Sequence, residues 1–396
     1  MSKSRFVAWT IWAVASIFYA YQYILRVMPS IMLDDLMTQF HMDAAIFGQF
    51  SGVYYIGYVG MMIPVGIMMD KYGARKGMTA SMLLTAVGLL PIIFTNHWIY
   101  AIIGRFLIGV GSSAAILGAF KIIRMSFAEK HFTRMLSLTV SIGLLGAIYG
   151  GGPVSYLCQG LGYKDVVMIF AILGSILAVA TYCIVPEMEA EHKSSIMSDI
   201  KEVIGNARVM CTCVFAGLMV GPLEGFADVW GTVFLKQVYG FDGNISASLP
   251  SMIFMGMCFG SPVLSLLAEK TSALGAIIGA GIVMAISFFM LLTGLVSMTA
   301  MSIMFVIIGV ACAYQIIAIY KASTYVSDNV VGLTTAFTNM AIMFFGYIFH
   351  TAIGYTVHNM GGIGVSEALL YGVGIIPVAL TIGVVGFVGL MMADRK

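Results

Sequence analysis

Long apolar runs separated by short polar segments extend along the whole chain. A helix needs about 20 apolar residues to cross the hydrocarbon core of a bilayer, whereas strands of a membrane barrel alternate apolar and polar residues over about ten positions. The chain shows the first pattern, so we predict an all-α polytopic membrane protein with twelve transmembrane helices. The predicted spans are residues 6–33, 44–69, 78–95, 98–122, 135–158, 165–185, 209–236, 246–268, 273–294, 298–322, 332–357 and 367–392.

One polar stretch, residues 187–208, divides six spans from six. It predicts an N-terminal six-helix bundle over residues 1–186, a cytoplasmic linker over 187–208 and a C-terminal six-helix bundle over 209–396. The first apolar run is too long for a signal peptide and has no small-residue cleavage site. We therefore expect it to stay in the protein as a membrane span.

Composition excludes the soluble classes, because 60% of the 396 residues are hydrophobic and only 10% are charged, against roughly a quarter charged in an average soluble domain. The six cysteines lie in or beside apolar runs, and no His, Cys and carboxylate set has metal-ligand spacing. No Gly-x-x-x-x-Gly-Lys-Ser/Thr phosphate loop is present. We expect no metal or other cofactor, no catalytic residue and no direct use of ATP.

Basic residues are distributed unevenly over the predicted loops, and positive loops stay cytoplasmic. With the N-terminus inside, the outer segments hold only Lys164 and Lys236 of the 20 basic residues, and four more lie within spans. The fourteen on the inner side are Lys3, Arg5, Lys71, Arg75, Lys76, Arg124, Lys130, Arg134, Lys193, Lys201, Arg208, Lys270, Arg395 and Lys396. Both termini are thus predicted to be cytoplasmic in a plasma membrane (the inner membrane of a bacterium). Clusters of basic residues can also indicate nucleic-acid binding, but the loops between these spans are too short for that interpretation.

The two halves resemble each other at an offset near 200 residues. The run from Arg105 to Val110 aligns with the run from Phe305 to Val310, and Lys121 aligns with Lys321. Parallel repeats of six spans are the architecture of one large class of secondary transporters.

Two motifs strengthen this interpretation. Residues 66–76, GIMMDKYGARK, follow the second span and contain Gly66, Asp70, Gly73 and Arg75. This segment resembles the loop signature of the major facilitator superfamily. The fourth span carries Arg105-x-x-x-Gly109, which is similar to the buried-arginine motif of that family. For these six residues the resemblance implies gating and structural roles, with Gly66 allowing close helix approach and Asp70 pairing with a helix N-terminus or an arginine.

The resemblance implies two six-helix bundles that rock about a midplane site, with spans one, four, seven and ten lining the cavity, and we expect a monomer. Ionisable residues inside a membrane are costly and usually functional. Arg26, Glu224 and Asp228 are the strongest candidates, with Arg26 about seven residues from the outer end of span one. The remaining candidates for substrate contact share helical stripes with Arg26 or lie in span ten: Tyr19, Gln22, Tyr23, Tyr314 and Lys321. For Lys121 and Lys321, snorkelling to the interface and a cavity role stay open.

These observations predict a secondary active transporter that takes up a small anionic or zwitterionic organic solute, with Glu224 or Asp228 carrying a coupling proton. Export of an amphiphilic compound and uptake of a siderophore-type polycarboxylate remain alternatives. A membrane-embedded enzyme would need a catalytic constellation that the sequence lacks. A channel would need a continuous polar pore, whereas these charges cluster near one predicted level.

Overall fold

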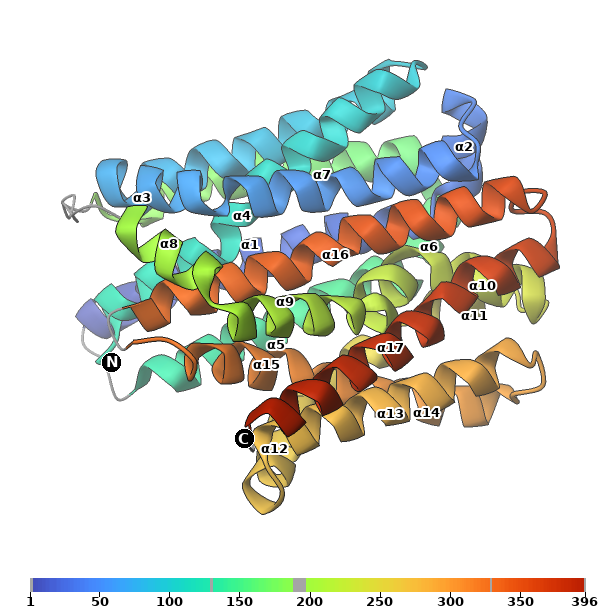
Figure 1. Cartoon of the computed structure of the whole chain (residues 1–396). Coiled ribbons are helices and arrows are strands. Elements are labelled where there is room, and N and C mark those ends of the chain that lie inside the picture. Colours follow the sequence, from blue (N-terminus) through green and yellow to red (C-terminus); the bar gives the residue numbers. More distant parts are fainter. Residues whose placement is uncertain (1–2, 129–130, 188–196, 328–329, 395–396) are drawn as a thin grey trace. The chain divides into compact units, whose positions relative to one another are not determined.

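The computed structural model describes residues 3–128, 131–187, 197–327 and 330–394, and every regular element within these ranges is helical (Figure 1). In this part of the chain, eleven helical segments are long and apolar enough to cross a membrane, and a bent pair of helices supplies a twelfth. The predicted all-α fold with twelve transmembrane helices is confirmed.

Contacts divide the chain into two compact units. The first unit comprises Met1–Met42 and Val53–Lys193, and the second comprises Asp43–Gly52 and Ser194–Lys396. The division after residue 193 falls inside the polar stretch predicted as a linker. The second unit also includes the first residues of span two, which the sequence pattern placed with the N-terminal bundle.

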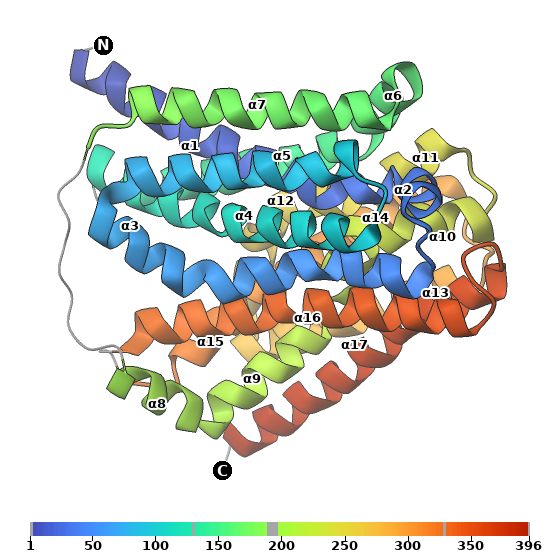
Figure 2. The same ribbon diagram turned by 90° about the horizontal axis from the view of Figure 1, so that it is seen from above.

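The first unit is built around α1, which packs against α4, α5 and α7 (Figure 2). α3 contains spans two and three, joined at Gly73, and α5 and α6 form the bent span, with an angle of 42°. The elements are α1 (Lys3–Val27), η1 (Met28–Ser30), α2 (Leu33–Phe40), α3 (Ala44–Phe94), α4 (Trp98–Ser126), α5 (Phe132–Gly150), α6 (Gly152–Leu161) and α7 (Tyr163–Ile184).

In the second unit, α12 packs against α14, and α17 packs against α13, α16 and α9. Spans seven and ten are each interrupted along their length. The elements are α8 (Met197–Gly205), α9 (Ala207–Leu218), η3 (Gly221–Trp230), α10 (Gly231–Val238), α11 (Gly243–Ser248), α12 (Ser251–Lys270), α13 (Ala273–Leu292), α14 (Met298–Cys312), α15 (Tyr314–Ser323), α16 (Val331–Asn359) and α17 (Ser366–Asp394).

Span one is shorter than the sequence pattern indicated. The α-helix ends at Val27, a 3₁₀ turn containing Pro29 follows, and a separate short helix begins at Leu33. Pro29 has no main-chain N–H to donate to the carbonyl of Leu25, four residues before it, and its ring crowds that carbonyl, which accounts for the early end of the α-helix. Arg26 therefore lies in the last turn of α1 and closer to the end of the span than the predicted seven residues.

The internal repeat is visible in one helix crossing within each unit. A Cβ added to Gly109 of α4 would collide with the carbonyl oxygen of Tyr54 in α3, and a Cβ on Gly309 of α14 would collide with that of Ile253 in α12. The two glycines are 200 residues apart and their partners are 199 apart. Small residues at such crossings let helices pack closely in lipid. The two halves thus repeat the same close contact at the offset found in the sequence.

Candidate functional site

The side chain of Arg26 lies among aromatic rings of the first unit. Its Cζ atom is 4.5 Å from the ring centroid of Tyr23 and 5.8 Å from that of Tyr55 in α3, and the residue is only 5% exposed. The ring of Tyr23 meets that of Tyr19 edge to face at 5.2 Å. Cations over aromatic faces are attracted by the ring quadrupole, so these rings stabilise a charge that the membrane interior disfavours.

Arg105 of α4 binds the end of the same helix. Its guanidinium donates to the carbonyl oxygens of Leu25 and Arg26, the latter at 2.8 Å from Nη2. The last carbonyls of a helix have no partner within it, and the membrane interior supplies no water to replace one. A cation at a helix C-terminus also interacts favourably with the helix dipole. Arg105 therefore fixes the main chain that carries Arg26.

Gln22 is connected to the same group through Tyr54, a residue that the sequence analysis missed. The Tyr54 hydroxyl donates to Gln22 Oε1 at 2.7 Å, and the Arg105 Cζ atom lies 4.8 Å over the Tyr54 ring. Tyr55 was missed as well. The signal that could have revealed both is the adjacent pair of tyrosines inside an otherwise apolar span.

The two predicted carboxylates lie on an unusual piece of helix in the second unit. Glu224 and Asp228 are each 1% exposed and belong to η3, a π-helical segment of ten residues. α9 ends at Leu218, and η3 begins with Gly221 and Pro222. π-Helical insertions are rare and frequent at functional sites, and discontinuous spans are typical of transporter binding sites. Periodicity along the chain indicated only an ordinary helix here.

Tyr314 supports this interruption. Its hydroxyl donates to the carbonyl oxygen of Ala216 at 2.6 Å. Ala216 lies in the last turn of α9, and its carbonyl also accepts from the main-chain N–H of Met219 at 3.1 Å. Tyr314 is itself the first residue after a break in span ten at Ala313. Glu224 lies near enough to Tyr314 for the two side chains to interact electrostatically. The structure thus brings these two predicted site residues together.

Lys321 lies elsewhere, at the far end of α15. Its Nζ atom is 2.9 Å from Asp394 Oδ2 and 4.4 Å from the ring centroid of Tyr325. The Tyr325 hydroxyl donates to the same carboxylate oxygen at 2.6 Å. Burial and this contact with Asp394 raise the pKa of Tyr325, so its hydroxyl remains a hydrogen-bond donor at neutral pH. Lys321 therefore forms an ion pair in the structure, and it lies apart from Tyr314.

Lys121 also has a specific partner. Its Nζ atom donates to the carbonyl oxygen of Met69 at 2.8 Å, the last residue of span two. This contact places Lys121 beside the loop that contains the family signature. The aligned lysines Lys121 and Lys321 thus each bind an acceptor at the end of a neighbouring span.

The loop itself turns at Gly73. This glycine has φ 84° and ψ 154°, a conformation that side chains with a Cβ rarely adopt. Arg75 places its Cζ atom 4.1 Å from the ring centroid of Tyr182 in α7. Around Gly66 the structure leaves room, because an added Cβ would lie 4.0 Å from Leu117 Cδ1. The close helix approach expected at Gly66 is therefore not found. The side chain of Asp70 lies outside the described part of the structure.

Lys76, the residue after Arg75, forms an ion pair. Lys76 Nζ is 2.6 Å from Glu187 Oε1, and both side chains are mostly exposed. The hydrogen bond from Lys76, and then its positive charge, hold the pKa of Glu187 below the ordinary value. The pair is consequently present at neutral pH and is lost as the pH falls through this lowered pKa.

Comparison with known proteins gives one family. The sequence profile described as Major Facilitator Superfamily matches residues 10–350. The multidrug transporter MdfA of Yersinia pestis is 25% identical over 226 residues, which are 55% of this chain and 54% of the relative. This chain thus spans about half the length of such relatives.

Two further proteins match over more of their length. The hexuronate transporter of Bacillus subtilis is 23% identical over 350 residues, covering 83% of this chain and 82% of the relative. Among solved structures, the nucleoside transporter NupG superposes with a TM-score of 0.79 at 13% identity, covering 98% of this chain and 99% of that one. At this identity the structural likeness concerns the fold alone.

Proposed function

The chain belongs to the Major Facilitator Superfamily, and from that premise we propose that it takes up a small anionic or zwitterionic organic solute by proton-coupled alternating access. In this proposal Arg26 binds the acidic group of the solute. Glu224 and Asp228 accept a cation, which is the coupling proton or an amine of the solute.

The observation that carries the proposal is the setting of Arg26. An arginine at membrane depth is expensive unless it has a function or a strong partner. Here aromatic rings surround the side chain, and a second arginine binds the main chain of residue 26. The guanidinium offers a planar fork that suits a carboxylate and keeps its charge. Such a preorganised cation supports recognition of an acidic group.

The carboxylates support coupling to a cation. Glu224 and Asp228 are four residues apart on η3 and are both buried. Two ionised carboxylates at this spacing repel each other, so a cation bound between them is favoured electrostatically. The interruption before η3 also allows this segment to rearrange without unwinding a continuous helix.

The similarity to the hexuronate transporter supports an anionic solute, because this relative matches over most of both chains. Export of an amphiphilic compound is the second candidate, and the similarity to the multidrug transporter favours it. The two candidates predict opposite directions of net movement under the same proton gradient.

Purified protein in sealed liposomes separates these candidates. A thermal-shift screen against amino acids, peptides, carboxylates, siderophores and lipophilic cations first identifies compounds that bind. We then expect a radiolabelled carboxylate or amino acid to show saturable counterflow and to accumulate when the exterior is more acidic. Binding of lipophilic cations alone, with acid-driven release from the liposomes, would favour export and contradict the proposal.

Membrane orientation forms part of the proposal, with both termini in the cytoplasm. The basic residues of the predicted inner segments support it. Single cysteines introduced near Arg75 and Lys201 should react with an impermeant reagent only after the cells are opened, and those near Asp43 and Asp242 should react in intact cells. Labelling near Lys201 in intact cells would contradict this topology.

A further inference from the structure

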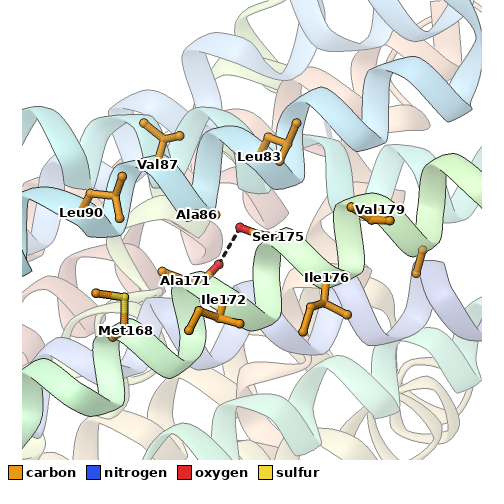
Figure 3. A pocket seen from close by; sticks show the side chains of 11 residues that line it. Leu83, Ala86, Val87, Leu90, Met168, Ala171, Ile172, Ser175, Ile176 and Val179 are labelled. Carbon is orange, nitrogen blue, oxygen red and sulfur yellow. Dashed lines mark hydrogen bonds between the residues drawn. The ribbon is translucent and has the colours of Figure 1, made fainter.

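A groove lies on the first unit between α3 and α7, within spans three and six (Figure 3). Its volume is about 580 Å³. The α3 wall is formed by Leu83, Ala86, Val87 and Leu90, and the α7 wall by residues of the stretch from Met168 to Ala180. The thirteen residues from Met168 to Ala180 rise about 18 Å along the helix axis, so the α7 wall exceeds the depth of one leaflet, which is about half of the ~30 Å hydrocarbon core.

The walls of this groove suit an alkyl chain. Ser175 is the one residue with a side-chain polar atom among the eleven lining residues, and its hydroxyl donates to the carbonyl oxygen of Ala171 at 2.9 Å (Figure 3). No donor or acceptor on the lining side chains therefore demands a polar ligand. Val87, Ile172 and Ile176 are all more than half exposed, which leaves the groove accessible from the lipid side.

Polar residues continue both walls at one end. On α3 the helical stripe of Leu83 runs at four-residue spacing through Thr79 to Arg75, and on α7 the stripe of Ser175 reaches Tyr182 after seven residues. The guanidinium of Arg75 packs over the Tyr182 ring at 4.1 Å, so the two stripes meet. Within the described part of the chain, Arg75 Nε and the Thr79 hydroxyl are buried without a hydrogen-bond partner.

We propose that this groove binds one acyl chain of an anionic glycerophospholipid, whose phosphate lies on the guanidinium of Arg75. A glycerol ester carbonyl supplies an acceptor at the level of Thr79, one turn nearer the bilayer centre. Charged hydrogen bonds between arginine and phosphate are strong and directional. Basic groups between spans on the cytoplasmic side are a common basis for recognition of lipid head groups, and the loop containing Arg75 is predicted to be cytoplasmic.

Charge around Arg75 favours an anionic head group over a zwitterionic one. The nearby carboxylate of Glu187 forms its ion pair with Lys76 and interacts only more weakly with Arg75, so Lys76 offsets most of the charge of that acid. Lys71 adds a further exposed positive charge on the same loop, and with Asp70 included the segment 66–76 has a formal charge of +2. An anionic lipid gains about 1 kcal/mol per basic residue near the surface, or roughly a fivefold change in affinity. The proposal therefore predicts discrimination by head group as well as binding of a chain.

Native mass spectrometry of the purified full chain tests this inference without any transport measurement. Protein in mild detergent is titrated with phosphatidylglycerol and with phosphatidylcholine of identical acyl chains. We expect one phosphatidylglycerol to bind roughly fivefold more tightly than phosphatidylcholine, in line with about 1 kcal/mol per basic contact. Inorganic phosphate at millimolar concentration should not displace it, because the acyl chain provides the larger part of the binding.

Three variants locate the site. Arg75→Gln should remove the preference for phosphatidylglycerol. Arg134→Gln, which changes a basic residue in the first turn of α5, should keep it. Ser175→Phe should fill the groove and weaken binding of both lipids, whereas Ile169→Phe on an exposed position of α7 outside the groove should not. Equal retention of the two lipids by the unmodified protein, or equal effects of Arg75→Gln and Arg134→Gln, would overturn the inference.

Discussion

Arg105 donates a hydrogen bond from Nη2 to the carbonyl oxygen of Arg26 at 2.8 Å, so one buried arginine fixes the main chain from which another projects. The contact uses the main-chain carbonyl of residue 26, and the Arg26 side chain itself packs over the rings of Tyr23 and Tyr55. Arg105 is accordingly a positioning residue. The different uses of the two arginines lead to different expectations for their substitution.

Arg105→Lys should reduce both stability and affinity. Lysine carries a single ammonium, which does not reproduce the fork that reaches both Leu25 and Arg26. A carbonyl left without a donor costs about 1–3 kcal/mol, so we expect a comparable loss in the free energy of unfolding. Substrate KM should rise because residue 26 is held less firmly. Arg134→Lys, at an exposed position of α5, is the control, and similar unfolding curves for the two variants would refute this role.

Arg26→Lys should lower the affinity for the solute without lowering the stability of the protein. Lysine keeps the positive charge and the main-chain carbonyl that Arg105 binds, but it lacks the bidentate geometry for a carboxylate. We expect affinity for the solute to fall by about tenfold, the effect of losing ~1.4 kcal/mol from one charged hydrogen bond. Thermal unfolding should change little. The measurements are a binding isotherm and a melting curve, and unchanged affinity would place the acidic group of the solute elsewhere.

The sequence was most informative about features that the residue types themselves mark, such as apolar spans and ionisable residues within them. Apolar runs predicted the positions of the spans. The offset of 200 residues, found in the sequence as aligned runs, recurs in the structure as the helix crossings at Gly109 and Gly309. Arg26, Glu224 and Asp228 were conspicuous because few ionisable residues lie inside apolar segments.

The features that the sequence did not predict depend on main-chain geometry. The partners of Arg105 and Tyr314 are carbonyl oxygens, which every residue possesses and no pattern marks. The π-helical segment around Glu224 differs from an α-helix in hydrogen bonding while keeping similar side chains. Its only hint in the sequence was the Gly221 and Pro222 pair. Such interruptions have to be observed in three dimensions.

Alanine substitutions at Gly109 and Gly309 should destabilise the protein, whereas the same substitution at Gly66 should not. An added methyl group at Gly109 or Gly309 meets a carbonyl oxygen of the crossing helix, and overpacking of this kind costs about 1–3 kcal/mol or more. A methyl group added at Gly66 would make only an ordinary van der Waals contact. Alanine is also favoured over glycine within a helix by up to ~1 kcal/mol. We expect lower melting temperatures for Gly109→Ala and Gly309→Ala and an unchanged or higher one for Gly66→Ala. Equal effects at all three positions would contradict the repeated crossing.

Lys321 and Asp394 should be energetically coupled. Both side chains are largely buried in their ion pair, and breaking such a pair is destabilising. Without Lys321, the Asp394 carboxylate would keep, among the described residues, only the Tyr325 hydroxyl and the more distant Arg208 Nη1 atom at 3.6 Å. We expect Lys321→Met and Asp394→Asn each to destabilise the protein, and the double variant to cost less than the sum of the two. A double-mutant cycle of unfolding free energies measures this coupling. Strict additivity would show that the pair contributes no specific interaction, and loss of solute binding in Lys321→Met alone would restore its predicted substrate role.

The carboxylates of η3 should determine whether solute accumulation is coupled to the proton gradient. A transporter that loses its proton acceptor can still exchange solute across the membrane, because exchange requires no net proton movement. We therefore expect Glu224→Gln or Asp228→Asn to abolish accumulation driven by a pH gradient while counterflow of labelled solute continues. The neutral amides preserve the shape of the side chains, so η3 should remain folded. Proteoliposome uptake, with and without an imposed gradient, measures both activities in one preparation.

Glu367→Gln provides the matched control for that experiment, since Glu367 lies in the first turn of α17 and is exposed. It removes one negative charge from the same unit without altering η3. This variant should accumulate solute as the unmodified protein does. If both η3 variants also concentrate solute with normal pH dependence, the carboxylates have a structural role in the second unit and the coupling ion binds elsewhere. If one variant loses counterflow as well, that carboxylate contacts the solute itself, and its cationic partner is then an amine of the substrate.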